Sequence, residues 1–304
     1  MAVPMLKKED VESIIFGCKV IGEPKVGGQK IVFPCLINGK TIAVKFILLR
    51  EDITVNITDE KSEEIEEILN RATREIDIMN HIESPYLVPK GIIGSRDIIY
   101  NGQRLFYYDE EWIDGDDLKS VFKDPNNLDY KEVLNLCEDI TKAIDALWQL
   151  KKIHRDIKIE NIIRRKSNGR YVLLDLGIAF DLEDKSLTKF GFVVGTPQYY
   201  SPEQLDLYHR RSIDFRSDLF SLGVVMYVIL TGKYPFYRNK CTFEEIAHNV
   251  IYAREVEPYK FNPNIPKKLS DLVTRLLKKQ PSQRFNNIEK LLKVVESIRE
   301  DMEV

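Results

Sequence analysis

The feature that most constrains this chain is a run of eight residues near its middle. Residues 154–161 read His-Arg-Asp-Ile-Lys-Ile-Glu-Asn, and Asp175, followed by Leu and Gly, comes fourteen positions after Asn161. These segments supply an acid that can take a proton, a lysine, an amide oxygen and a second carboxylate. Such groups suit the movement of a phosphoryl group, where catalysis is mostly positioning, charge neutralisation and metal bridging. The pattern therefore predicts phosphoryl-transfer chemistry.

Composition predicts an ordinary globular protein of the cytoplasm. The 304 residues are 43% hydrophobic and 31% charged, which suits one large bilobed domain or two smaller ones. A formal net charge of −3 gives no reason to expect nucleic acid or an anionic membrane as a partner. The four cysteines are widely spaced and are expected to be reduced thiols. No apolar run reaches the roughly 18–20 residues that span a bilayer, and the N-terminal residues do not resemble a secretory signal.

The chain changes character near Glu111. Before it, β-branched and aromatic residues predict strands at 31–33, 40–47 and 104–108, and Asn38-Gly39 predicts a hairpin turn. One helix is expected among them, with Ser62 as its N-cap, an end at His81, and apolar residues at helical spacing. These apolar residues are Ile65, Ile68, Leu69, Ala72, Ile76 and Met79. From Leu118 onward helical patterns dominate, and residues 222–230 predict a buried helix.

Lys45 and Glu75 are a predicted ion pair. Lys45 ends Ile-Ala-Val-Lys on a strand that is apolar on both sides, so its ammonium group needs an anion to pair with. Glu75 lies on the following helix between apolar residues. We therefore expect the two side chains to meet.

The order of these motifs resembles the eukaryotic-type (Hanks-type) serine/threonine protein kinases. Downstream, Gly-Thr-Pro at 195–197, Ser-Pro-Glu at 201–203, Asp218 and Arg284 follow in the order that these kinases have, so the resemblance runs from about Val20 to Arg284. It implies an α+β, bilobed fold: a small antiparallel N-lobe sheet with one αC helix, and a larger, mainly helical C-lobe. The whole chain, 1–304, would be one kinase domain, with an N-lobe at 1–111, a hinge at 112–117 and a C-lobe at 118–304.

The resemblance assigns a role to each catalytic candidate. Asp156 would accept or orient the proton of the substrate hydroxyl, and Lys158 would neutralise charge on the transferring phosphoryl group. Thr196 would bond both of them. Asn161 and Asp175 would hold Mg²⁺, with Mn²⁺ as the alternative, while Lys45, paired with Glu75, would reach the α- and β-phosphates of ATP.

A second set of residues would contact the nucleotide. The expected contacts are Gly22, Gly27, Gly28, Val32, Ala43, Lys45, Glu111, Ile113, Asp117 and Ile163. The glycine-rich loop departs from the family pattern, because Gly-x-Gly-x-x-Gly is absent and two registers fit. Lys30 takes the place of the last glycine and is a candidate phosphate contact. Glu110 aligns where kinases usually have a hydrophobic residue or threonine, so either the register slips by one residue or the pocket behind the nucleotide is closed.

The expected substrates are proteins with serine or threonine acceptors. Lys158 and Gly-Thr-Pro favour this branch of the family, and Ser186 and Thr188 are candidates for autophosphorylation in the activation segment. Asp114, Asp116, Asp117 and Glu160 predict a mild preference for basic residues near the acceptor. The protein is expected to be a monomer or transient dimer. Two alternatives are a pseudokinase-like nucleotide-binding scaffold, favoured by the irregular glycine loop, and a small-molecule kinase of related fold.

Overall fold

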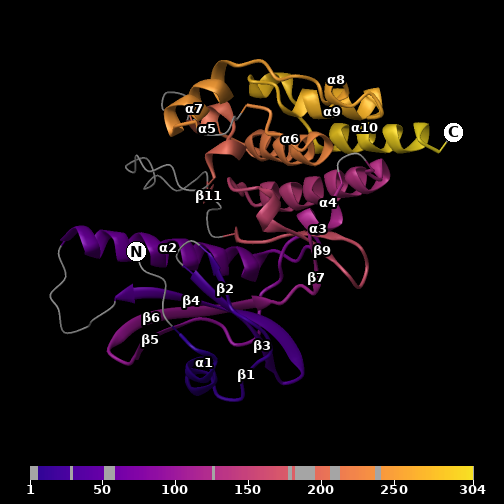
Figure 1. Ribbon diagram of the computed structural model, residues 1–304. Coiled ribbons are helices and arrows are strands. Elements are labelled where there is room, and N and C mark those ends of the chain that lie inside the picture. Colours follow the sequence, from indigo (N-terminus) through magenta and orange to yellow (C-terminus); the bar gives the residue numbers. More distant parts are fainter. Residues whose placement is uncertain are drawn as a thin grey trace. The chain divides into compact units, whose positions relative to one another are not determined.

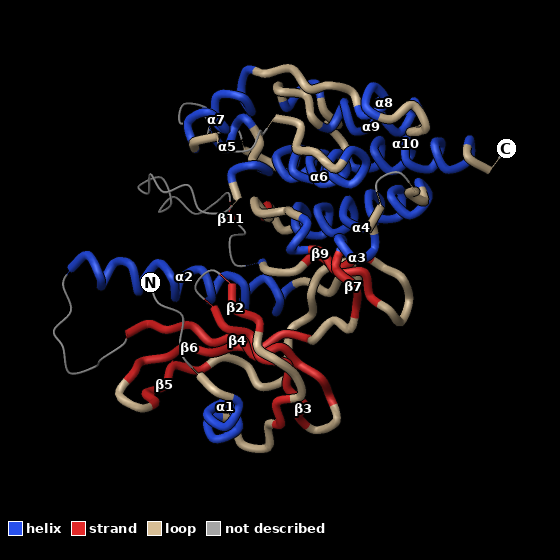
Figure 2. Tube along the Cα trace, viewed as in Figure 1, coloured by secondary structure: helices blue, strands red, loops and turns tan. Residues whose placement is uncertain are grey.

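The computed structural model describes residues 6–27, 30–50, 59–124, 127–176, 180–181, 196–205, 213–236 and 241–303. Two compact units divide the chain, a first unit of Met1–Ile113 and a second unit of Asp114–Val304 (Figure 1). Strands dominate the described part of the first unit and helices that of the second (Figure 2). This content agrees with the α+β class predicted from the sequence.

The first unit is an antiparallel sheet with helices on its faces. Its elements are α1 (Lys8–Ile14), β1 (Lys19–Val20), β2 (Lys25–Gly27), β3 (Lys30–Ile37), β4 (Lys40–Arg50), α2 (Asp59–His81), β5 (Arg96–Tyr100) and β6 (Gln103–Glu111). The strand order is β1-β3-β4-β6-β5, with β2 paired to β3. The three predicted strands are thus confirmed as β3, β4 and β6. Asn38 and Gly39 form the predicted turn, with φ values of 49° and 76° that suit these two residue types.

The alternation of side chains along β3, β4 and β6 gives the sheet two different faces. One face carries large apolar side chains such as Phe33, Phe46 and Leu105, which pack in one core with Val11 of α1. The other face carries Lys45, which lies between Val32 on β3 and Tyr108 on β6 in the strand register. The helix α1 was not predicted from the sequence, and it closes the apolar face.

The helix α2 begins earlier than predicted. It starts at Asp59, so Ser62 lies inside the helix as an exposed residue, and the prediction of Ser62 as the N-cap is wrong. Residues 59–61 contain neither glycine nor proline, so nothing in them stops the helix from extending by most of a turn. The helix ends at His81 as expected. Glu75 falls on the buried side of the helix with Ala72 and Met79, at helical spacing.

The second unit is mainly helical. Its elements are β7 (Gly115–Asp117), α3 (Leu118–Val121), α4 (Tyr130–Gln149), β8 (Lys152–Ile153), η1 (Ile159–Asn161), β9 (Ile162–Arg165), β10 (Tyr171–Leu173), β11 (Phe180–Asp181), η4 (Pro197–Tyr199), α5 (Pro202–Leu205), α6 (Phe215–Thr231), α7 (Phe243–Tyr252), α8 (Pro258–Phe261), α9 (Lys267–Leu276), η6 (Pro281–Gln283) and α10 (Ile288–Asp301).

Two helices form the centre of this unit. α4 packs on α6, on α10 and on the small sheet β10-β9-β7, while α6 also packs on α9. The predicted buried helix at 222–230 is confirmed as part of α6, where all but one of these nine residues are buried. None of the helices in the described ranges is both long enough and apolar enough to cross a membrane.

Candidate active site

Lys45 lies on β4 between two buried carboxylates of the first unit. Its Nζ is 2.6 Å from Oε1 of Glu75 on α2 and also 2.6 Å from Oε2 of Glu110 on β6. The three side chains are 5%, 0% and 6% exposed. The ion pair between Lys45 and Glu75 is the one that the sequence predicted. The second ion pair, to Glu110, was not predicted.

Glu75 has two further partners in the same unit. Its Oε2 accepts a hydrogen bond of 2.8 Å from Nζ of Lys30 on β3 and one of 2.7 Å from the hydroxyl of Tyr108 on β6. Lys30, a candidate phosphate contact, thus pairs with the carboxylate that also holds Lys45. Charged groups of alternating sign therefore run from Glu110 through Lys45 and Glu75 to Lys30, and their formal charges sum to zero.

The carboxylates keep Lys45 charged. Burial alone would lower the pKa of the Lys45 ammonium group. The negative charges of Glu110 and then Glu75 outweigh this effect and raise the pKa above its ordinary value. Lys45 is therefore a permanent cation in a desolvated site.

The other nucleotide-contact candidates of the first unit lie on or beside the same sheet. Val32 and Ala43 share the face that carries Lys45, since Val32 is opposite Lys45 and Ala43 is opposite Glu110. Gly27 is opposite Lys30 at the end of the β2–β3 pair. Gly28 lies outside the described residues. A further three candidates lie near strand ends: Gly22 before β2, Glu111 at the end of β6, and Ile113 two residues later.

Gly22 is also a close-packing position. A Cβ atom built there would lie 3.0 Å from Cγ of Pro34 on β3, so a larger residue would press on that strand.

The catalytic candidates of the second unit gather in the segment after β8. Asp156 is 3% exposed, and its Oδ2 lies 2.6 Å from Nζ of Lys158 and accepts a 3.0 Å hydrogen bond from Nδ2 of Asn161. The same nitrogen donates to the backbone oxygen of Asp156 at 2.9 Å. The other carboxylate oxygen, Oδ1, is buried and accepts no hydrogen bond from the described residues. Asp156 is thus held through one oxygen while the second stays available as an acceptor.

The backbone around Asp156 is fixed from α6. Asp218 is 1% exposed and accepts hydrogen bonds from the backbone N–H groups of His154 and Arg155 at 2.7 and 2.8 Å. Burial raises the pKa of Asp218, although these two donors act against the rise. Arg155 has a φ of 68°, an unfavourable conformation for a residue with a side chain, and the contact to Asp218 holds it there.

His154 ties the catalytic segment to the strand that precedes Asp175. Its ring Nδ1 accepts the backbone N–H of Asp156 at 3.3 Å, and Nε2 lies 3.1 Å from the backbone oxygen of Leu174. Since Nδ1 is the acceptor, the proton belongs on Nε2, which donates to Leu174. The backbone N–H of Leu174 in turn donates to the backbone oxygen of Asn161 at 2.8 Å.

This backbone hydrogen bond brings together the segments that carry the two metal-ligand candidates, Asn161 and Asp175. Asp175 follows Leu174 directly and has a φ of 59°. The amide nitrogen of Asn161 points to Asp156, so the amide oxygen faces away from Asp156. A carboxylate and an amide oxygen are the hard donors that Mg²⁺ prefers, and these two residues fit such an ion.

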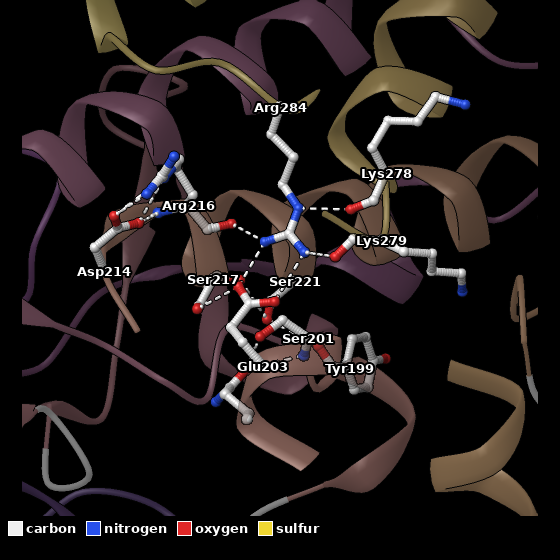
Figure 3. Close-up of polar contacts among 11 residues, drawn as sticks. Tyr199, Ser201, Glu203, Asp214, Arg216, Ser217, Ser221, Lys278, Lys279 and Arg284 are labelled. Carbon is white, nitrogen blue, oxygen red and sulfur yellow. Dashed lines mark hydrogen bonds and ion pairs between the residues drawn. The ribbon is translucent and has the colours of Figure 1, made fainter. Parts of the chain in front are cut away.

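A buried ion pair supports this unit away from Asp156 (Figure 3). Two nitrogens of Arg284 lie 2.6 and 2.9 Å from the carboxylate oxygens of Glu203 on α5, and Ser217 of α6 donates to the same carboxylate at 2.6 Å. Arg284 also donates to the backbone oxygens of Arg216, Lys278 and Lys279, so all three of its nitrogens are used.

The structure gives fewer contacts for the remaining candidates. Asp117 on β7 and Ile163 on β9 are directly opposite each other in the small sheet. Thr196 directly precedes η4, and in the described part of the chain its side chain makes no hydrogen bond to Asp156 or Lys158. Its role stays a prediction. Ser186 and Thr188 lie outside the described residues.

Sequence reasoning missed Glu110, Tyr108 and Lys30 as partners in the lysine cluster. The signal was present in β6, where Phe106, Tyr108 and Glu110 alternate with residues of the opposite face and therefore point to the same side as Lys45. The alternation of side chains along a strand would have placed Glu110 beside Lys45 if the register of β6 had been certain.

Comparison with known proteins identifies the family. The family model described as "Protein kinase domain" matches residues 20–295. A probable serine/threonine-protein kinase of Clostridium perfringens is 28% identical over 256 residues, which is 84% of this chain and 36% of that protein. The serine/threonine-protein kinase PrkC of Bacillus subtilis is 28% identical over 243 residues, 80% of this chain and 36% of its own length.

A third relative matches a shorter segment of this chain, at slightly higher sequence identity. The serine/threonine-protein kinase PknB of Mycolicibacterium smegmatis is 33% identical over 183 residues, 60% of this chain and 28% of its own length. The chain thus spans between about a quarter and little more than a third of the length of these three relatives. The family match, by contrast, covers nearly the whole chain and agrees with the fold and with the order of motifs: the chain belongs to the protein kinase family.

Proposed function

We propose that this chain is an ATP-dependent serine/threonine protein kinase that transfers the γ-phosphate of ATP to serine or threonine hydroxyls of proteins. The observation that carries the proposal is the environment of Asp156. One of its oxygens is held by Lys158 and Asn161, and the other is a buried acceptor that no described residue uses. A carboxylate held in this way suits the acceptance of a proton from a hydroxyl group.

Four residues of the second unit have roles in the proposed reaction. Asp156 orients the acceptor hydroxyl through Oδ1 and takes its proton as the hydroxyl oxygen bonds to the γ-phosphorus, while the bond from that phosphorus to the β–γ bridging oxygen breaks and ADP leaves. Lys158 offers its ammonium group to the charge of the transferring phosphoryl group. Asn161 and Asp175 would hold Mg²⁺, or alternatively Mn²⁺, and the ion would supply charge neutralisation at the phosphates.

The first unit would bind the nucleotide. Lys45, kept charged by its two carboxylates, would pair with the α- and β-phosphates. The apolar residues Val32 and Ala43, on the same face as Lys45, would lie against the base. Ile163 stays a predicted nucleotide contact of the second unit. We propose that residues 1–304 act as one kinase domain, with the division between the lobes near residue 113.

The serine/threonine specificity rests on sequence likeness. The three relatives are named serine/threonine-protein kinases, and Lys158 occurs at the position that favours this branch. A mild preference for basic residues near the acceptor stays a prediction that rests on four acids of the second unit, Asp114, Asp116, Asp117 and Glu160. A cytoplasmic location, autophosphorylation and a monomeric or transiently dimeric state stay predictions as well.

The direct test is transfer of labelled γ-phosphate from Mg-ATP to the chain itself and to a basic generic protein. Asp156→Asn removes the acid and keeps the shape of the side chain, and we expect a loss of roughly 10²–10⁴ in rate. Asp271→Asn makes the same change at an exposed aspartate of α9 and is expected to leave the rate unchanged. Undiminished transfer in Asp156→Asn would overturn the proposal, as would label on tyrosine in place of serine or threonine.

A further inference from the structure

Lys45, the proposed phosphate contact, is paired with two carboxylates. Glu75 and Glu110 approach its ammonium group to the same distance, 2.6 Å, and all three side chains are almost completely buried. The charges of Glu110 and Glu75 both raise the pKa of Lys45. Two carboxylates therefore already neutralise the charge of this ammonium group. A phosphate that binds Lys45 must compete with both of them.

Glu75 has partners in addition to Lys45. Glu75 is held by Lys30 and by the hydroxyl of Tyr108 as well as by Lys45, so it keeps two donors when Lys45 moves. A substitution at Glu110 therefore leaves Lys45 with a carboxylate, Glu75, that other donors also hold in place.

Glu110 also lies where it would affect a nucleotide. It is directly opposite Ala43 in the register of β4 and β6, and it precedes Glu111, which ends β6. Its carboxylate thus shares the sheet face that carries Lys45 and Val32. Charge in this desolvated place acts more strongly than charge in water.

We propose that Glu110 is a competing counter-ion of Lys45 that weakens the binding of nucleotide phosphates and so sets the affinity of the site for phosphorylated nucleotides. The inference rests on the proposed function, since it takes Lys45 as the phosphate contact. Glu110 acts through Lys45 and is a positioning residue. The affinity for a phosphate falls by the fraction of time that Lys45 is released from Glu110, as for any site whose competent form is only partly populated.

The proposal predicts a direction that a purely structural role does not. Glu110→Gln keeps the shape of the side chain and removes its charge, so Lys45 keeps one carboxylate and becomes available to phosphate. We expect ATP and ADP to bind about fivefold more tightly, which corresponds to Lys45 being released about one fifth of the time in the unchanged chain. Adenosine carries no phosphate, so its affinity is expected to stay within twofold.

The experiment is titration calorimetry of the full chain with Mg-ADP, Mg-ATP and adenosine. Glu110→Asp keeps a carboxylate and is expected to bind as the unchanged chain does, whereas Glu110→Met, apolar and of similar length, should behave like Glu110→Gln. Glu66→Gln makes the same charge change at an exposed position of α2 and should alter nothing. Steady-state assays should show a lower KM for ATP with kcat within twofold, and thermal unfolding without ligand checks that each variant is folded.

The outcomes separate this inference from the proposed function. Tighter ADP and ATP binding in Glu110→Gln and Glu110→Met, with unchanged adenosine binding, supports competition. Unchanged or weaker ADP binding in both, while the unchanged chain still binds ADP and transfers phosphate, overturns the inference alone. If one variant does not fold, the other decides. Absence of nucleotide binding in the unchanged chain and in every folded variant removes the proposed function together with the inference.

Discussion

Lys30 and Lys45 share one carboxylate but differ in how deeply they are buried. The side chain of Lys30 is 23% exposed and that of Lys45 is 5% exposed, and both reach Glu75. An ion pair that water reaches is weakened by solvent screening, so Lys30 contributes less than Lys45 to holding Glu75. The two lysines should therefore be separable by substitution.

Replacement of each lysine by methionine tests this difference. Lys45→Met removes the proposed phosphate contact, and we expect kcat/KM to fall by about 10² or more. Lys30→Met leaves Tyr108 and Lys45 on Glu75, so the expected fall is less than tenfold, with the KM for ATP nearly unchanged. Steady-state kinetics at several ATP concentrations make the comparison. A large rise in the KM for ATP in Lys30→Met would instead favour Lys30 as a direct phosphate contact.

The identities of the site residues could be read from the sequence, but some of their partners could not. Asp156, Lys158 and Asn161 follow one another at fixed short spacing, and the local chain brings them together. A prediction of Glu110 as a partner of Lys45 required the register of β6, which the sequence left uncertain by one residue. A shift of one residue turns a strand side chain to the opposite face, so this uncertainty hid the second ion pair of Lys45.

At the scale of elements, the contact between α6 and α9 depends on a glycine. A Cβ atom built on Gly223 of α6 would lie 2.8 Å from Cβ of Leu276 and 3.3 Å from Cδ2 of Leu277. Leu276 is the last residue of α9, and both leucines are fully buried. The two segments can approach this closely only because residue 223 has no side chain.

Gly223→Ala is therefore expected to destabilise the protein. Alanine favours the helical state over glycine by about 1 kcal/mol, but overpacking of a tight core costs about 1–3 kcal/mol. We expect the second effect to prevail, with a net loss of up to about 2 kcal/mol. Urea unfolding followed by circular dichroism measures it, with Val228→Ala as a comparison at a half-buried position of the same helix. A more stable Gly223→Ala variant would mean that the leucines move aside without cost.

Elements with long runs of apolar, β-branched or aromatic residues were predicted well, and a short element without such a run was not. The strands β3, β4 and β6 are rich in β-branched and aromatic residues, and α6 contains a long apolar stretch. The seven-residue helix α1 has one fully buried position of its own, Val11, so its sequence carries little periodic signal. Its place is decided by tertiary packing on the sheet, which the local sequence does not report.

At the scale of the whole molecule, the ion pair of Glu203 and Arg284 makes stability depend on pH. Burial would raise the pKa of Glu203, but Arg284 and Ser217 outweigh it and hold the pKa below its ordinary value of 4.5. A carboxyl group whose pKa is lower in the folded state contributes stability above its unfolded pKa. This contribution is lost as the pH falls through the lower, folded value.

Glu203→Gln makes the pH dependence measurable. At pH 7 the variant leaves Arg284 as an unpaired buried charge, and we expect a loss of about 3–5 kcal/mol. As the pH falls below 4.5 toward the lower, folded pKa of Glu203, the stability contributed by the ionised carboxylate shrinks, so the difference between the two proteins should narrow. Urea unfolding at pH 7, 5, 4 and 3.5 tests this, with Glu289→Gln as an exposed control. A difference that stays constant down to pH 3.5 would contradict the assignment.

The same ion pair orders events in time while the chain is being made. Glu203 and Arg284 are 81 residues apart. At about 5–20 residues per second, synthesis produces Arg284 about 4–16 s after Glu203. During this interval the acid has no arginine to join, although every residue of the first unit already exists. The first unit can therefore fold on a nascent chain, whereas the second must wait for the last tenth of the sequence.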